Sequence, residues 1–104
     1  MQEITTKQLN DGDYLLYIYT PFCGTCALAR TMLEKIEQVH KETIFYEMNA
    51  SLYPEFMIEN QVESVPCLFI MKDNQIKEKV YAFQSIPNIY GYLMEYKPEL
   101  FVKN

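Results

Sequence analysis

A Cys-x-x-Cys motif at residues 23–26 stands between an apolar run and a long helical pattern. The run Tyr14–Tyr19 has six consecutive apolar or aromatic residues, which predicts a strand covered on both faces. At a helix start, unpaired backbone N–H groups and the positive end of the helix dipole favour a thiolate over a thiol. The spacing places Cys26 one turn into the helix, within reach of Cys23 for a disulfide. Because thiolates attack in thiol–disulfide exchange, we expect a reactive pair.

The helical pattern after the motif begins at about residue 23 or 24 and ends at about His40. Its apolar positions recur every three or four residues, which predicts a helix lying against a sheet; they are Ala29, Met32, Leu33, Ile36 and Val39. Arg30 and Glu34 fall on the opposite, solvated face as a weak ion pair. The apolar segment Thr43–Met48 then predicts a second strand, parallel to the first through a right-handed crossover.

The rest of the chain predicts shorter elements. The opening residues favour a short strand near Ile4 and the Thr pair, then at most one helical turn at residues 7–10. Ser85 is the expected N-cap of a last helix, and Pro98 stops that helix. Between these ends we expect a helix at about 52–60, a strand at 67–71, a hairpin turn at 72–75, an antiparallel edge strand at 76–83 and a helix at about 86–96.

Length and charge exclude several classes of protein. The 104 residues are the size of one domain, so we expect residues 1–104 to form a single unit. A formal net charge of -5 argues against capture of nucleic acid or anionic lipid. The opening lacks the basic start and apolar segment of a secretory signal, and no segment has the length of a membrane span, so the expected location is the cytoplasm.

The remaining candidate metal ligands are too few for a zinc site with the cysteine pair. Only Cys67 and His40 remain. His40 lies about 24 Å from Cys23 along the helix at about 1.5 Å per residue, and we expect it to be solvated at the helix end. Cys67 follows Pro66 directly but alternates to the other face of its strand, which favours a small buried residue; the alternative is a third redox thiol.

The order of elements, Cys23-Gly24-Thr25-Cys26 and the later Val65-Pro66 together resemble the thioredoxin superfamily, in particular small bacterial-type thioredoxin-like proteins. The resemblance covers essentially the whole chain. It implies an α/β thioredoxin fold, with a central mixed β-sheet flanked by helices. It also implies that Cys23 is the exposed nucleophile, that Cys26 is the buried resolving thiol, and that Val65 with a cis Pro66 lines the substrate groove.

The resemblance extends to other substrate-contacting positions. Tyr81 and Ala82 fall where the family has a further substrate-contacting loop, and Phe22 falls where it usually has Trp. Gly24 and Thr25, inside the motif, complete this expected surface. Thr25 replaces the usual proline and supplies a backbone N–H and a hydroxyl, either of which can stabilise the Cys23 thiolate. Such stabilisation predicts a more oxidising disulfide than that of thioredoxin.

Two further departures concern the proton of Cys26. Tyr17 stands where thioredoxins keep a buried aspartate, and Glu47 stands where they pair that aspartate with lysine. With no aspartate, the candidate proton acceptors for Cys26 are Glu47, reaching across adjacent strands, and water.

The resemblance implies a thiol–disulfide oxidoreductase that reduces or exchanges disulfides in protein substrates. It implies a flavin- and NADPH-dependent thioredoxin reductase as electron donor, no bound cofactor or metal, and a monomeric protein. One alternative is a glutaredoxin-like enzyme acting on mixed disulfides of a small thiol, although the acidic chain offers no evident cationic cluster for glutathione. Another is a non-catalytic thioredoxin-fold binding module whose cysteines only sense redox state.

Overall fold

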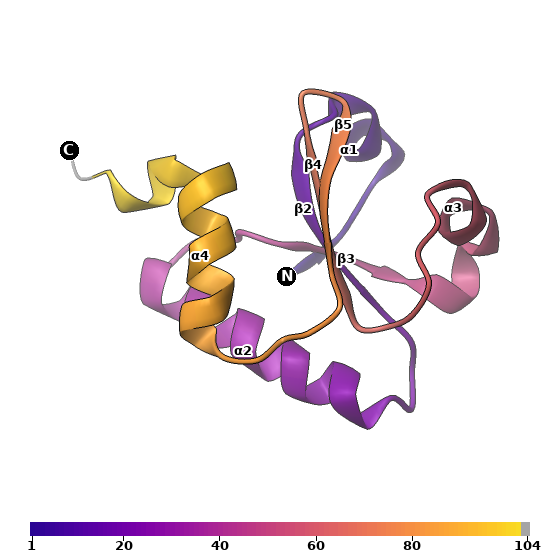
Figure 1. Cartoon of the computed structure of the whole chain (residues 1–104), viewed down its shortest axis with the longest axis horizontal. Helices are drawn as coiled ribbons and strands as arrows, with labels where there is room; N and C mark the ends of the chain where they lie inside the picture. Colours follow the sequence, from indigo (N-terminus) through magenta and orange to yellow (C-terminus); the bar gives the residue numbers. More distant parts are fainter. Residues whose placement is uncertain (103–104) are drawn as a thin grey trace.

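Strand β2 (Tyr14–Tyr19) lies at the centre of a five-stranded mixed sheet in the order β1-β3-β2-β4-β5 (Figure 1). The computed structural model describes residues 1–102. The elements along the chain are β1 Gln2–Glu3, α1 Thr6–Asp11, β2, α2 Gly24–His40, β3 Tyr46–Asn49, the 3₁₀ turn η1 Ala50–Leu52, α3 Pro54–Glu59, β4 Cys67–Lys72, β5 Gln75–Val80, α4 Ile86–Tyr96 and the 3₁₀ turn η2 Pro98–Phe101. The predicted α/β class with a central mixed sheet is confirmed.

The pairing of β2 explains why the sheet is mixed. β2 runs parallel to β3, with Tyr17 opposite Glu47, because α2 carries the chain back across the sheet between them. It runs antiparallel to β4, where Ile18 lies opposite Cys67. β4 and β5 form the predicted hairpin, and its turn residues Asp73 and Asn74 have positive φ values of 55° and 58°.

Helices cover the two faces of the sheet unequally. α2 and α4 pack on one face and α1 and α3 lie on the other (Figure 1). Alternate residues of β2 supply both cores: Leu15 and Tyr17 face α2 and α4, whereas Leu16 and Ile18 belong to the second core. The side chains of Leu16, Tyr17 and Ile18 are fully buried, so β2 is fixed on both sides.

Helix α2 agrees with the predicted range, and Cys26, Ala29, Leu33 and Ile36 form its buried stripe. Val39, expected on the same stripe, is 71% exposed, because the half-buried His40, four residues after Ile36, continues the stripe in its place. Helix α1 has six residues, more than the single predicted turn. Its start is fixed by a capping box in which Thr5 and Gln8 exchange side chain to backbone hydrogen bonds.

Strand β3 begins three residues later than predicted, at Tyr46 rather than Thr43. The reason is Glu37 of α2, whose carboxylate accepts hydrogen bonds from the backbone N–H groups of Ile44 (2.9 Å) and Phe45 (3.1 Å). These donors are therefore satisfied by a side chain and not by a neighbouring strand. β5 also ends before its predicted limit, at Val80 rather than Phe83, and residues 81–85 are irregular.

We predict that Glu37→Ala lowers the free energy of unfolding by about 1–3 kcal/mol, since it leaves buried backbone donors without an acceptor. Urea unfolding measures this loss. Glu34→Ala on the same helix is the charge-matched control, because Glu34 is exposed. Equal stability losses in the two variants would show that the carboxylate of Glu37 does not hold the chain between α2 and β3.

Candidate active site

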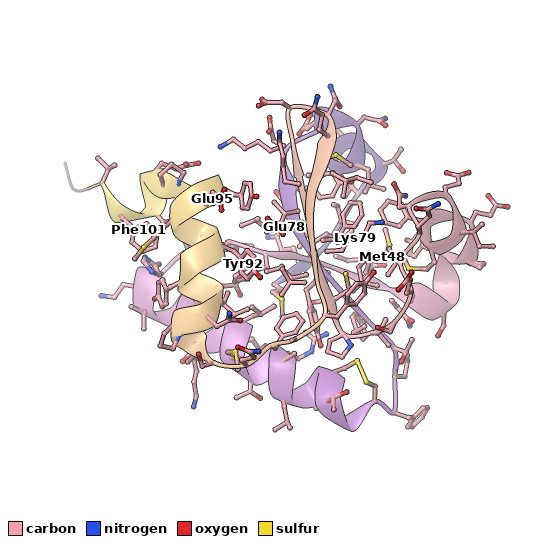
Figure 2. All side chains as sticks on the ribbon, in the orientation of Figure 1. Met48, Glu78, Lys79, Tyr92, Glu95 and Phe101 are labelled. Carbon is pink, nitrogen blue, oxygen red and sulfur yellow. A yellow bond between two sulfur atoms is a disulfide. The ribbon has the colours of Figure 1, made fainter. Side chains whose placement is uncertain are left out.

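Cys23 is the N-cap residue of α2, and it is joined to Cys26 by a disulfide (Figure 2). The Cα atoms are 5.1 Å apart. The backbone N–H of Cys26 points at Cys23 Sγ at 3.2 Å, so the helix start donates to the sulfur that becomes a thiolate on reduction. Cys23 is half-buried, whereas Cys26 is only 3% exposed. The pair therefore has one accessible and one protected sulfur.

Thr25 places a second polar group at the same sulfur. Its Oγ1 lies 3.4 Å from Cys23 Sγ. Thr25 is the second residue of α2, and its side chain is exposed at the helix mouth. A hydroxyl at this distance can donate to a thiolate, which a proline at position 25 could not do.

A groove of about 370 Å³ reaches the motif at Thr25. It brings together four of the residues predicted to contact substrate, namely Thr25, Val65, Pro66 and Tyr81. The Val65–Pro66 peptide bond is cis. The remaining lining residues are Leu28, Ala29, Met32 and Phe83. All eight lining residues are uncharged, so the groove suits an uncharged segment of a partner.

The sequence does not predict four of the lining residues, namely Leu28, Ala29, Met32 and Phe83. Leu28 could have been found from the sequence, because it is an apolar residue that falls outside the buried stripe of α2. In the structure it is 72% exposed. Ala29 and Met32 are expected on the face against the sheet, and each of them lies both in that core and in the groove lining.

Three residues predicted to contact substrate lie outside the groove lining. Phe22 is fully exposed beside Cys23 and has a positive φ of 62°. Gly24 and Ala82 are exposed as well. Tyr81 does more than line the groove, because its hydroxyl accepts a hydrogen bond from the Glu63 backbone N–H at 3.2 Å and so ties the segment before Val65 to the segment after β5.

A polar cluster lies behind Cys26. The Tyr17 hydroxyl donates to the Cys26 carbonyl oxygen, and burial raises the pKa of Tyr17 to about 12. Arg30 pairs with Glu47 through two hydrogen bonds of 3.2 and 3.1 Å, and not with Glu34 on the solvated face as expected. Arg30 prefers Glu47 because Glu47 lies opposite Tyr17 in the next strand and offers both carboxylate oxygens. The proton-acceptor role of Glu47 stays a prediction.

The thioredoxin family model matches residues 2–93, which is most of the chain. The chain belongs to the thioredoxin family. It is 41% identical over 90 residues to the thioredoxin-like protein YusE of Bacillus subtilis, a match that covers 86% of this chain and 85% of that protein. A Listeria monocytogenes thioredoxin is 25% identical over 79 residues, covering 75% of this chain and 77% of that protein.

Solved thioredoxin structures share the fold. Oxidised mitochondrial thioredoxin 3 of Saccharomyces cerevisiae superposes with a TM-score of 0.73 at 17% identity, covering 91% of this chain and 94% of that chain. A mutant thioredoxin of Halobacterium salinarum gives a TM-score of 0.71 at 17% identity, covering 92% of this chain and 88% of that chain. Family membership and the cysteine pair at the start of α2 indicate thiol–disulfide oxidoreductase chemistry in general.

Cys67 is a free, fully buried thiol on β4, which confirms the prediction of a buried residue on the far face of its strand. It packs in the second core with Ile18, Met48 and Phe69. Desolvation by this burial raises the pKa of Cys67 to about 12, and the charge of Lys79 opposes the rise. A neutral buried thiol is a poor nucleophile.

His40 lies at the end of α2, away from the cysteine pair. His40 is not solvated as predicted: its Nε2 lies 3.0 Å from the Tyr90 hydroxyl, and its ring packs on Tyr90 and Phe101. Among residues 1–102, no group of three or more His, Cys, Asp or Glu side chains could hold a metal ion. Within the same range, none of the helices is long and apolar enough to span a membrane.

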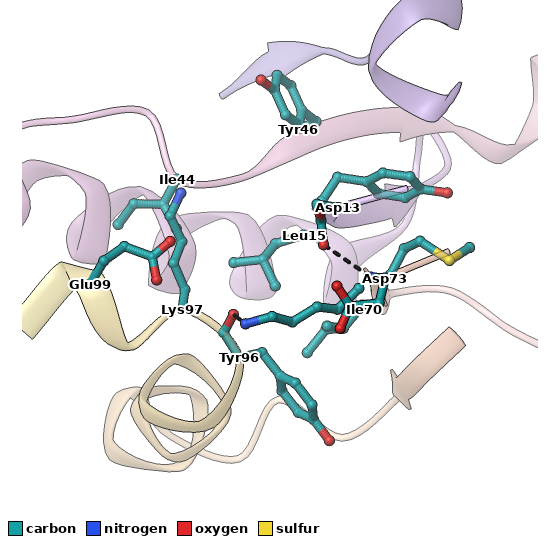
Figure 3. Close-up of a pocket in the computed structure, with 12 residues that line it drawn as sticks. Asp13, Leu15, Ile44, Tyr46, Ile70, Asp73, Tyr96, Lys97 and Glu99 are labelled. Carbon is teal, nitrogen blue, oxygen red and sulfur yellow. Dashed lines mark hydrogen bonds between the residues drawn. The ribbon is translucent and has the colours of Figure 1, made fainter. Parts of the chain in front are cut away.

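A cavity of about 400 Å³ lies at the end of β2 opposite to the cysteines (Figure 3). There the Lys72 ammonium donates to the Tyr96 carbonyl at 3.1 Å, and Asp13 accepts from the Asp73 backbone N–H at 3.0 Å. These contacts tie β4 to the end of α4 and the β4–β5 turn to the start of β2.

We predict that Cys67 makes stability depend on pH. The pKa of Cys67 in the folded protein lies above the ordinary value of 9.0. Below pH 9 the thiol is neutral in the folded and the unfolded protein, and its contribution to the free energy of unfolding is fully present. As pH rises from 9 toward 12 the thiol ionises in the unfolded protein first, so this contribution is lost. Above pH 9, the oxidised wild type should lose up to about 1.4 kcal/mol per pH unit relative to Cys67→Ala. Urea unfolding of the two proteins across this range measures the difference. Parallel curves would contradict the burial, and so would alkylation of Cys67 as fast as that of Cys23 in the folded protein after the Cys23–Cys26 disulfide is reduced.

Proposed function

We propose that this protein reduces or exchanges disulfides in protein substrates, with Cys23 as nucleophile and Cys26 as resolving thiol. The observation that carries the proposal is the unequal environment of the two sulfurs. Cys23 is accessible and receives the Cys26 N–H at the helix start, whereas Cys26 is almost fully buried beneath it. Unequal exposure makes the first sulfur the one that meets an external disulfide.

The proposed reaction proceeds in two exchanges. The Cys23 thiolate attacks one sulfur of the substrate disulfide, which forms a mixed disulfide and releases the other substrate sulfur as a thiolate that takes a proton from solvent. Cys26 then loses its proton and attacks Cys23 Sγ, so that the Cys23–Cys26 disulfide forms and the second substrate thiolate leaves. Two electrons pass from the cysteine pair to the substrate.

The groove supports a peptide as the substrate. Its uncharged lining, with Val65 and the cis Pro66 at one wall, suits an extended chain that pairs with the backbone at Val65. Phe22, Gly24, Thr25, Tyr81 and Ala82 would form the surrounding contact surface. The same lining disfavours the glutaredoxin-like alternative, because an anionic thiol such as glutathione needs cationic partners.

After each turnover the Cys23–Cys26 disulfide must be reduced again. A thioredoxin reductase would return the oxidised pair to the dithiol, so that the protein needs no cofactor of its own. We propose that the protein works as a cytoplasmic monomer, and its net charge of -5 favours neither nucleic acid nor anionic membranes as a partner.

The test of this function is the reduction of insulin by dithiothreitol. We expect the wild type to accelerate precipitation of the reduced insulin chains and Cys23→Ser to abolish the acceleration, since the attacking sulfur is gone. Cys67→Ala is the matched control and should keep the activity. A wild type without effect would favour the binding module that only senses redox state.

Two further arms refine the outcome. Cys26→Ser should accumulate mixed disulfides through Cys23, because the resolving thiol is missing, and non-reducing electrophoresis displays them. Turnover with NADPH and thioredoxin reductase supports the proposed donor. Turnover only with glutathione and its reductase would favour the glutaredoxin-like alternative.

We predict a reduction potential less negative than the approximately -270 mV of thioredoxin, because Thr25 and the helix start stabilise the Cys23 thiolate. Thr25→Pro and Thr25→Val should each lower the potential by about 30 mV or more, since loss of about 1.4 kcal/mol of thiolate stabilisation has this effect. Thr25→Ser keeps the hydroxyl and should keep the potential. Equilibration with glutathione buffers measures it; a wild-type value equal to that of Thr25→Pro contradicts the prediction.

A further inference from the structure

The Arg30 guanidinium is fixed behind the cysteine pair by groups from two strands. Both Glu47 oxygens accept from it at 3.1 and 3.2 Å. Its Cζ lies 4.8 Å from the Tyr19 ring centroid and 5.3 Å from that of Tyr17, and these two rings stack with centroids 5.7 Å apart. A bidentate carboxylate and two aromatic faces leave the cation little freedom to move.

This fixed cation belongs to the environment of Cys26. Arg30 follows Cys26 by one helical turn, a spacing that puts the two side chains on the same face with Cβ atoms about 5–6 Å apart. The Tyr17 ring under the guanidinium also donates its hydroxyl hydrogen to the Cys26 carbonyl oxygen. Cys26 is 3% exposed and the Arg30 side chain is 30% exposed, so water screens the field of the cation at the buried sulfur only in part.

The other titratable groups around this site are neutral or anionic. From β2, Tyr17 and Tyr19 face it; burial raises the pKa of both phenols, that of Tyr17 to about 12, so they are neutral at physiological pH. Glu47 of β3 pairs with the cation directly. Glu34 of α2 and Glu3 of β1 add weaker negative fields to Tyr17 and Tyr19 respectively. Arg30 is thus the cation of the cluster.

We propose that Arg30 is the positioning residue that favours the Cys26 thiolate in the resolving step, with Glu47 as the anchor and attenuator of its charge. The inference rests on the proposed function, because it concerns the second exchange of that reaction. When Cys26 gives its proton to water, the new thiolate forms beside a preformed positive charge that needs no rearrangement. Of the two acceptors predicted for the Cys26 proton, water therefore takes it, and Glu47 acts through Arg30.

The opposed signs of Arg30 and Glu47 provide the test. The full chain carrying Cys23→Ser, labelled with ¹³Cβ-cysteine, reports the titration of Cys26 by NMR, and Cys26→Ser assigns its signal. We expect Arg30→Gln to raise the titration midpoint by about one pH unit, and Glu47→Gln to lower it. Arg30→Lys should restore most of the wild-type midpoint. Lys35→Gln, which removes an exposed cation further along α2, is the matched control and should leave it unchanged.

Each contrary result overturns the inference. An unchanged midpoint in Arg30→Gln removes the electrostatic role. A higher midpoint in both Arg30→Gln and Glu47→Gln indicates either a structural disturbance or Glu47 as proton acceptor, because an attenuator must shift the titration in the opposite sense. The titration requires no substrate, so it is independent of insulin reduction: an active protein with an unchanged midpoint overturns this inference alone, and an inactive protein with the expected shifts overturns the proposed function alone.

Discussion

The burial of β2 on both faces is the constraint on which the rest of the molecule depends. Leu16, Tyr17 and Ile18 are fully buried, and their alternation feeds two separate cores. The strand therefore cannot slip by one residue without moving each side chain into the wrong core. Because the register is fixed, the chain leaves the sheet at a fixed point, and Cys23 meets the start of α2 where the backbone N–H of Cys26 faces its sulfur.

The elements that could be predicted from the sequence are those with a strong periodic signal. β2 and α4 have the predicted bounds, and α2 is within a residue of them, because continuous apolar runs and three- to four-residue spacing report burial directly. Prediction from the sequence is wrong where a side chain, and not a neighbouring strand, accepts the hydrogen bonds of backbone N–H groups. The apolar residues Ile44 and Phe45 look like strand, yet the Glu37 carboxylate accepts their N–H groups, and no periodicity carries that information.

The candidate site divides in the same way. The motif and Val65-Pro66 could be recognised because they are local signatures, and the fold brings Thr25, Val65, Pro66 and Tyr81 to one groove. The ion-pair partner of Arg30 could not be assigned from the sequence. Glu34, four residues later on the same helix, is an equally plausible partner by spacing, whereas the partner in the structure is Glu47 on β3. Only the register that sets Tyr17 opposite Glu47 decides between them.

That register also explains how a chain without the buried aspartate can accommodate charge behind its resolving thiol. A carboxylate at position 17 would be a buried anion on the strand that faces Cys26, and it would oppose the thiolate whenever it was ionised. Tyr17 replaces it with a neutral hydroxyl that holds the Cys26 carbonyl and a ring that supports Arg30. The charged pair near Cys26 is Arg30 and Glu47, whose side chains are 30% and 18% exposed. Its desolvation therefore costs less free energy than that of a fully buried ion pair. The cation then shares a helix with the cysteine while its counter-ion stands on the neighbouring strand, an arrangement that favours a thiolate.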